Sequence, residues 1–243
     1  MRFIAQYQMS VFGQFMHISP DVEIMNKLLN TLSTKLKFLP GTINVVSSDV
    51  LFDRGVLKQI PRIQMTDEGG RWRIVILPDR IDVNYDSIDS TDIQPFSEIS
   101  NIAKNLLLNT LETLKLSCGR IAINFTCLLP SSSKIKINQF YTKIVNPFKF
   151  QQGKDIVEWQ IVSNSPSTTD LSKNQNEPIN LLTNIALFQT NEGERVGIII
   201  DINTSAVNLS ERFSNIDVNE FYSYAFNKSE DICNDIMELW KND

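Results

Sequence analysis

The amino-acid sequence predicts an α+β protein in which antiparallel sheets carry long helices packed on one face. Apolar and polar side chains alternate along residues 60–85 in three short runs, which is typical of strands with one buried face. Residues 96–114 instead repeat apolar side chains at helical spacing. The expected order of elements in residues 1–117 resembles that in residues 118–243. We therefore expect two pseudo-repeated halves, which form either two domains or one continuous domain.

The three runs in residues 60–85 predict a meander of adjacent antiparallel strands. Gly69 and Gly70 can adopt positive φ in the first turn at no steric cost, and Pro78 presets the backbone of the second. One face of these strands is expected to be buried under helices. Its apolar side chains are Ile63, Met65, Trp72, Ile74, Ile76, Ile81, Val83 and Tyr85.

The segment before the meander predicts a strand, a helix and a second strand. Residues 2–12 alternate, and the expected buried side chains are Phe3, Ala5, Tyr7, Met9 and Val11. Ser19 is the expected N-cap of the helix, with Pro20 in its first turn, and Pro40-Gly41 is expected to end it. Residues 43–47 predict a short strand, and 48–59 a connection.

The helix over 96–114 follows a polar, acidic loop at 86–94 and has the widest apolar stripe in the chain. After it, residues 121–127 alternate as a strand. Residues 131–145 fit either a short helix or an irregular excursion, and both alternatives stay open. Val157, Trp159 and Ile161 predict a further strand.

Residues 163–178 contain almost no large apolar side chain, so we expect a mobile loop that has nothing to bury against the entropy of ordering. Residues 179–189 and 195–203 predict a hairpin around Gly193. A last helix is expected from Asp217, with Glu220 three residues on as a capping-box partner.

Composition and charge narrow the classes of function. The 243 residues carry a net charge of −5, which argues against general nucleic-acid binding but not against a local basic patch. Three cysteines without metal-site spacing indicate free thiols in a reducing compartment, so we expect a cytoplasmic protein. The sequence contains neither a secretory signal nor an apolar run long enough to span a membrane, and we expect no membrane partner.

Two stretches carry a resemblance to known proteins. The segment TDEGGRWRIVILPDRIDV is similar to the central hairpin of a sporadically distributed prokaryotic family of uncharacterised proteins. RVGIIIDINT, followed by a final helix with the aromatic pair Phe221 and Tyr222, resembles the end of the same family. The resemblance implies a protein of unknown function encoded beside mobile or defence-related genes. The layout of elements also resembles the TATA-binding-protein-like and helix-grip topologies, as an analogy of fold that carries no function.

The residue types needed for catalysis are sparse. His17 is the only histidine, and histidine is the usual general base near neutral pH. An acidic series could serve a metal-dependent phosphodiesterase centred on Asp79 and Asp82, but residues 81–85 lack the lysine that such chemistry wants. The whole series is Asp79, Asp82, Asp86, Asp89 and Asp92, with Asp201 at the end of a later strand. We expect no catalytic centre, no metal and no cofactor.

The candidate binding residues are Arg62, Arg71, Arg73 and Arg80. Arg71 and Arg73 share a strand face, and Arg62 is expected across from them, so that together they could bind phosphate or carboxylate. The favoured hypothesis is a non-catalytic protein-interaction or adaptor protein. Its partner would be another protein or a second copy bound through a sheet edge. A nucleic-acid-binding module that uses the arginine face is the alternative, and the phosphodiesterase is the second alternative.

Overall fold

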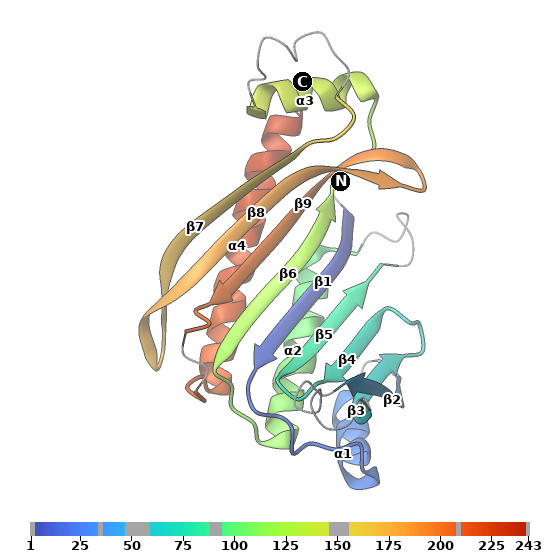
Figure 1. Ribbon diagram of the computed structural model, residues 1–243, viewed down its shortest axis with the longest axis vertical. Helices are drawn as coiled ribbons and strands as arrows, with labels where there is room; N and C mark the ends of the chain where they lie inside the picture. Colours follow the sequence, from blue (N-terminus) through green and yellow to red (C-terminus); the bar gives the residue numbers. More distant parts are fainter. Residues whose placement is uncertain are drawn as a thin grey trace, which may run out of the picture.

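A computed structural model of the chain describes residues 3–33, 36–46, 59–87, 94–145, 156–207 and 210–241. Within these residues the polypeptide forms nine strands and four helices (Figure 1). In chain order they are β1 (Phe3–Phe12), α1 (Val22–Leu32), β2 (Phe38–Val46), β3 (Gln59–Asp67), β4 (Trp72–Ile76), β5 (Arg80–Asp86), α2 (Phe96–Leu114), β6 (Arg120–Leu128), α3 (Lys134–Val145), β7 (Gln160–Leu171), β8 (Asn174–Thr190), β9 (Gly193–Thr204) and α4 (Asn215–Lys241).

The described strands form one antiparallel sheet in the order β2-β3-β4-β5-β1-β6-β9-β8-β7. Its centre is the pair β1 and β6, in which Tyr7 lies opposite Phe125 and Met9 opposite Ile123. From this pair the strands follow outward as β5, β4, β3, β2 on one side and as β9, β8, β7 on the other. Residues before and after position 118 therefore share one sheet, and one continuous hydrophobic core includes side chains from both.

Helices α1, α2 and α4 lie on one side of the sheet (Figure 1). α2 packs against β1 and β5, and α4 packs against β6, β7 and β9. The alternation of β1 places Tyr7, Met9 and Val11 under these helices, where each is at most 1% exposed. The Tyr7 hydroxyl donates to Ser100 Oγ of α2 at 3.0 Å. This contact confirms that α2 covers the face of the sheet that carries Tyr7.

The structure confirms the strands and the helix that were predicted from clear alternating or helical spacing of apolar side chains. The meander of residues 60–85 is β3, β4 and β5, and the helix predicted over 96–114 is α2. The predicted hairpin around Gly193 is the β8–β9 pair, and Gly193 has a φ of +110° in its turn. Residues 131–145, left open between two alternatives, contain the helix α3. None of the helices in the described part of the chain is long and apolar enough to cross a membrane.

The loop predicted at residues 163–178 is wrong, because this segment forms most of β7 and the start of β8. The two strands pair from Gln160 opposite Ala186 to Leu171 opposite Asn174. Backbone hydrogen bonds do not require apolar side chains, and β7 is the outermost strand, so its serine and threonine side chains other than the buried Thr169 stay in water. The strand predicted from Val157 to Ile161 begins at Gln160, three residues later than expected.

The first helix also differs from its predicted bounds. Its N-cap is Asp21, whose carboxylate accepts a hydrogen bond from the Ile24 N–H at 2.9 Å, and not Ser19. The helix ends at Leu32, before Pro40-Gly41, which lie within β2. Proline is tolerated there because, of the described strands, only β3 pairs with β2.

Two further corrections concern single residues. A register shift between Ile4 and Gln6 puts Ile4, and not Phe3, on the face of Tyr7. α4 begins at Asn215, and the side chains of Ser214 and Asp217 hydrogen-bond each other at its start. The connection predicted at 48–59 lies outside the described residues except for Gln59, and the predicted loop at 86–94 lies mostly outside them.

Candidate interaction surface on the open face of the sheet

The face of the sheet opposite α2 and α4, here called the open face, carries one polar row across five neighbouring strands. In register, this central row consists of Arg73 on β4, Asn84 on β5, Gln8 on β1, Asn124 on β6 and Asp201 on β9. Adjacent strands lie about 4.8 Å apart, so the row spans about 19 Å. Because the strands alternate, these side chains point away from the helices that cover Tyr7.

The central row runs from a cation through three amides to a carboxylate. The four side chains from Asn84 to Asp201 are half-buried, and Arg73, at the other end of the row, is exposed. Within the described residues, no protein group hydrogen-bonds the side chains of Asn84 or Asn124. Each amide group offers two N–H donors and a carbonyl acceptor. The middle of the open face therefore has hydrogen-bonding capacity that the described fold does not use.

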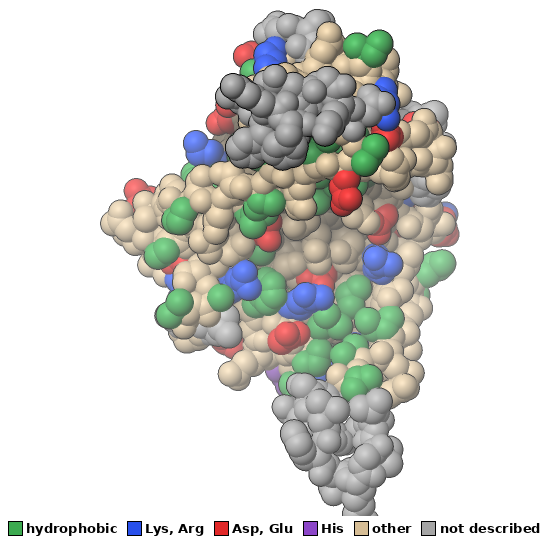
Figure 2. All heavy atoms as spheres, turned by 45° about the horizontal axis from the view of Figure 1, so that its top comes forward, with side chains coloured by type: hydrophobic (Ala, Val, Ile, Leu, Met, Phe, Trp, Pro, Cys, Tyr) green, Lys and Arg blue, Asp and Glu red, His purple; other side chains and the backbone are tan. Residues whose placement is uncertain are grey.

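The guanidinium groups of the open face already have acceptors. Arg73 Nη2 lies 3.4 Å from Asp86 Oδ2, and Arg80 Nε lies 3.0 Å from Asp82 Oδ2. Arg120 Nε donates to the Thr204 carbonyl at 3.3 Å. Figure 2, which views the open face obliquely, shows basic and acidic side chains interspersed on it. The face is thus mixed in charge, without a basic surplus.

Arg62 does not join the other predicted binding residues, which corrects the expected arginine cluster. It is 1% exposed, and its guanidinium donates to the carbonyls of Met16 and Ile18 at 3.1 and 2.8 Å. Arg71 is half-buried in the turn before β4, where its carbonyl accepts from the Asp86 N–H. An alternating pattern predicts on which face of a strand a side chain lies. It cannot show that a connection distant in the sequence, here the one between β1 and α1, covers that side chain.

The aromatic side chains of the meander lie on the helix side, as predicted. Trp72 and Tyr85 are 2% and 1% exposed, and their rings contact each other at a centroid distance of 4.9 Å. The central row contains no aromatic side chain. Stacking of bases on this row would therefore have no platform.

The predicted acidic series is dispersed over separate contacts. Asp82 is 4% exposed and accepts a hydrogen bond from the Ser10 hydroxyl at 2.6 Å. Burial raises the pKa of Asp82, while Ser10 and Arg80 partly lower it. Asp86 binds Gln6 and Arg73 instead. In the described part of the chain, His, Cys, Asp and Glu side chains form no group of three that could hold a metal ion.

The remaining predicted candidates, Asp79, Asp201 and His17, occupy three different places in the fold. Asp79 is in the β4–β5 turn, where its carbonyl accepts from the Gly13 N–H at 3.0 Å. Asp201 accepts a hydrogen bond from Asn203 at 2.8 Å. His17 is exposed in the connection between β1 and α1. Asp89 and Asp92 lie outside the described residues.

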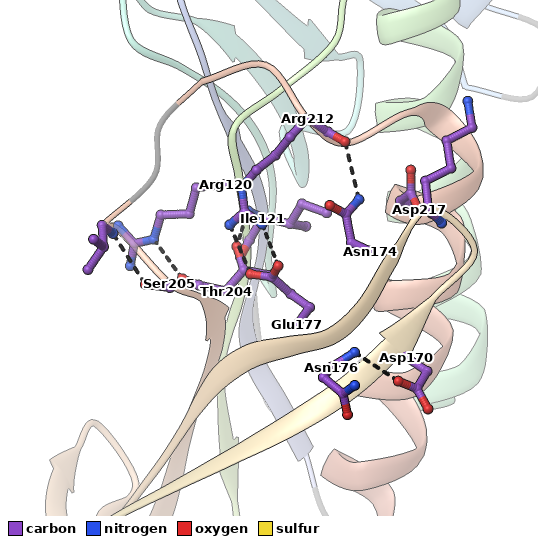
Figure 3. A network of polar contacts seen from close by, with 12 residues as sticks. Arg120, Ile121, Asp170, Asn174, Asn176, Glu177, Thr204, Ser205, Arg212 and Asp217 are labelled. Atoms are coloured by element: carbon purple, nitrogen blue, oxygen red, sulfur yellow. Dashed lines mark hydrogen bonds and ion pairs between the residues drawn. The ribbon is translucent and has the colours of Figure 1, made fainter.

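Sequence reasoning missed a polar network that joins the β7–β8 tip to the start of α4 (Figure 3). Arg212 binds both carboxylate oxygens of Glu177, with Nη2 2.8 Å from Oε1. Lys173 N–H donates to Asp217 at 2.9 Å, and Ser172 N–H donates to Glu220 at 2.7 Å. These pairs are 35 to 48 residues apart, so no local sequence pattern could have revealed them.

Asp217 is the most connected carboxylate of this network. Burial alone would raise its pKa, but hydrogen bonds from Ser214, from the Lys173 N–H and from Asn174 outweigh burial and lower the pKa. The network joins the β7–β8 tip to the start of α4, and its opposite charges are paired with each other. We therefore assign it to the fold and not to binding.

Residues of the described helices line hollows on the helix side of the sheet. One, of about 200 Å³, lies between α2 and α4 and is lined by Ser100, Lys104, Tyr222 and Ser223 among others. The other, of about 380 Å³, lies between α1 and α2 and is mostly apolar. Neither contains a convergent set of nucleophile, base and acid. The open face is the larger continuous candidate surface.

Comparison of the sequence with protein-family models and with curated proteins finds no match. The functional argument therefore comes from the geometry of the open face.

Proposed function

We propose that the protein is a non-catalytic protein-interaction module that binds its partner on the open face of the sheet. The central row is the observation that carries this proposal. Its amides stand in register on three neighbouring strands, two of them without a protein partner among the described residues. Fixed, unpaired amides match the donors and acceptors of another protein's surface.

The charge pattern favours a protein partner over nucleic acid. Phosphate backbones are bound by cations that are free to replace counterions. Here Arg73 and Arg80 already face carboxylates, and Arg62 is buried. The nucleic-acid alternative is thus weaker than the arginines within residues 62–80 indicate. The phosphodiesterase alternative has no support from Asp82, which is engaged by Ser10 and Arg80.

Apolar side chains at the β2 end of the open face add to the support for a protein partner. Leu39, Ile43 and Val45 share this face with Val75 of β4 by register. Leu39 is 57% exposed. Figure 2 shows hydrophobic side chains gathered toward one side of the view. Protein interfaces combine such apolar patches with hydrogen-bonding groups.

The sheet edges are less suited to binding than the face. Among the described strands, β2 pairs only with β3 and β7 only with β8. Pro40 lies in β2 and Pro166 in β7, and each removes one backbone N–H that an added strand would need. We therefore place the partner on the face and not along an edge.

As part of the same proposal, the two halves are related by internal duplication. Each half begins with a strand of the central pair, β1 or β6, which also pairs with the last strand of its own half, β5 or β9. Each half ends in a helix, α2 or α4, packed on the same side of the sheet. Duplication of one unit would explain this repeated order, and it supports the analogy to a TATA-binding-protein-like layout.

The test is capture of the tagged full-length chain from cells that express it naturally, with and without nuclease, read by mass spectrometry. We expect a protein partner that survives nuclease and is lost with Asn124→Arg, which puts a bulky cation in the middle of the row. Asn219→Arg is the matched control, because Asn219 is exposed on α4. A partner lost on nuclease treatment, or one retained equally by both variants, would contradict the proposal.

A further inference from the structure

We propose that a second copy of this chain binds the open face, giving a face-to-face dimer with a two-fold axis along β1 at Gln8. This inference rests on the proposed function and names its partner. The argument starts from the order of the central row, in which Gln8 is the third of five in-register positions. The positions at equal distance from Gln8 are chemically complementary.

A two-fold rotation about an axis parallel to β1, lying between two facing sheets, exchanges the strands on either side of β1. It places Arg73 opposite Asp201 of the partner subunit, and Asn84 opposite Asn124 of the partner subunit. The exposed 3.4 Å contact of Arg73 Nη2 with Asp86 leaves other N–H groups of the same guanidinium for this second carboxylate. Gln8 meets its own symmetry copy. Each ion pair occurs twice, as an isologous interface requires. Amide pairs need no difference between subunits, because each amide is both donor and acceptor.

The adjacent row tolerates the same packing. It contains Asp82, Ser10 and Ala122 in register. The rotation sets Asp82 opposite Ala122 of the partner subunit and Ser10 opposite its own copy. Asp82 is already paired with Arg80 and is 4% exposed, so it presents no unpaired charge to the partner. The short side chains of this row also leave room for the longer Gln8.

The contact between the two subunits is less favourable near Phe12, at the end of β1. There the rotation brings Arg80 toward Arg120 of the partner subunit, since both flank Phe12. Arg80 is neutralised by Asp82, and Arg120 is held by the Thr204 carbonyl and the Phe12 ring. The twist of each sheet also separates side chains that lie far from the axis. The best contact is therefore confined to the middle of the open face.

The expected contact area limits the affinity. Five strands at about 4.8 Å and about seven residues of each at 3.3 Å cover roughly 500 Å² per subunit. This is below the roughly 800 Å² per partner of a standard interface. We therefore expect a dimer that dissociates in the micromolar range, populated only at high protein concentration.

The experiment is sedimentation velocity of the full chain from low to high micromolar concentration. Wild-type protein is expected to shift from monomer to dimer. Arg73→Asp or Asp201→Arg alone puts like charges opposite each other and should weaken the dimer at least tenfold. Arg73→Asp combined with Asp201→Arg in one chain restores opposite charges and should recover most of the affinity. Gln8→Arg places two cations at the axis and should abolish it.

Asn219→Arg, on the exposed side of α4, is the control and should leave the dimer unchanged. Thermal melts of each variant show whether it is folded. A monomer at every concentration, or a double charge exchange no better than the single changes, overturns the dimer. If the wild type is monomeric while a nuclease-resistant partner is still lost with Asn124→Arg, the dimer fails and the open-face interaction module stands.

Discussion

The two ends of the sheet are held by different chemistry. The β7–β8 end carries serine and threonine side chains, and its Glu177 pairs with Arg212 in the segment before α4. The backbone N–H groups of Lys173 and Ser172 bind Asp217 and Glu220 of α4 itself. The β2–β3 end is packed under α1 and is joined to the β1–α1 connection by Arg62. The β7–β8 end thus depends on a polar clamp of ion-paired and hydrogen-bonded carboxylates, whereas the β2–β3 end combines an apolar face under α1 with one buried guanidinium, that of Arg62.

Breaking the clamp at the polar end should have the largest effect. Arg212→Met leaves the Glu177 carboxylate buried without its partner, so we expect a loss of about 3–5 kcal/mol in the free energy of unfolding. Urea unfolding measures this value. Lys27→Met breaks an exposed, solvent-screened pair with Glu23 in α1 and should lower the free energy of unfolding far less than Arg212→Met. Equal losses in the two variants would show that Glu177–Arg212 is not a clamp.

Removing Arg62 tests the opposite end. Arg62→Met keeps most of the side-chain stem but removes the donors for the carbonyls of Met16 and Ile18. We expect a loss of about 2–3 kcal/mol, because at least one buried acceptor is left unsatisfied. Hydrogen exchange should rise in β3 and the β1–α1 connection and stay unchanged in β7. Faster exchange in β7 would mean that the two ends are not held independently.

The centre of the sheet offers a smaller test of how α4 is attached. The Tyr222 hydroxyl donates to the carbonyl of Ser10 and lies 3.2 Å from that of Ala122, so it joins α4 to both central strands. Tyr222→Phe keeps the packing and should lower the free energy of unfolding by about 1–2 kcal/mol. Denaturant unfolding of the variant checks this value. A variant as stable as the wild type would assign the attachment of α4 to packing alone.

Two aspartates should give the smallest effects, with opposite pH dependence. Asp217 has a lowered pKa in the fold, so its stabilising contribution is present above the unfolded pKa of about 4 and is lost as pH falls through the folded value. Asp82 has a raised pKa, so its favourable contribution is present below about pH 4 and is lost as pH rises through the folded value.

Melting temperatures of Asp217→Asn and Asp82→Asn, from well below about pH 4 up to about pH 7, measure this difference. Relative to wild type, Asp217→Asn should become less stable as pH rises, and Asp82→Asn more stable. The same slope for both variants would contradict the assigned pKa directions.

The comparison of the two ends also explains what the sequence could predict. Residues with strong period-2 or helical patterns, such as 60–85 and 96–114, were placed correctly because burial determines both pattern and structure. Residues 163–178 were not, since their order comes from backbone pairing and from distant partners such as Arg212. In the candidate site, the pattern predicted the side of Arg73 but not the burial of Arg62.

The central row itself required the register of five strands. Gln8, Asn84 and Asn124 are ordinary polar residues of alternating strands when read one at a time. Only the pairing of β1 with both β5 and β6 places them side by side. The number of residues between two strands does not reveal the register in which they pair. This surface could therefore not have been predicted from the sequence alone.

The most direct measurement of open-face binding is photo-cross-linking from that face. A photoreactive amino acid at position 124 in the full chain, activated in cells that express it naturally, should give a cross-link to a protein. The same group at position 219 on α4 should not. Cross-links to protein from position 124 alone are the predicted result. Cross-links to nucleic acid from position 124, or equal protein cross-links from both positions, would contradict a protein-binding open face.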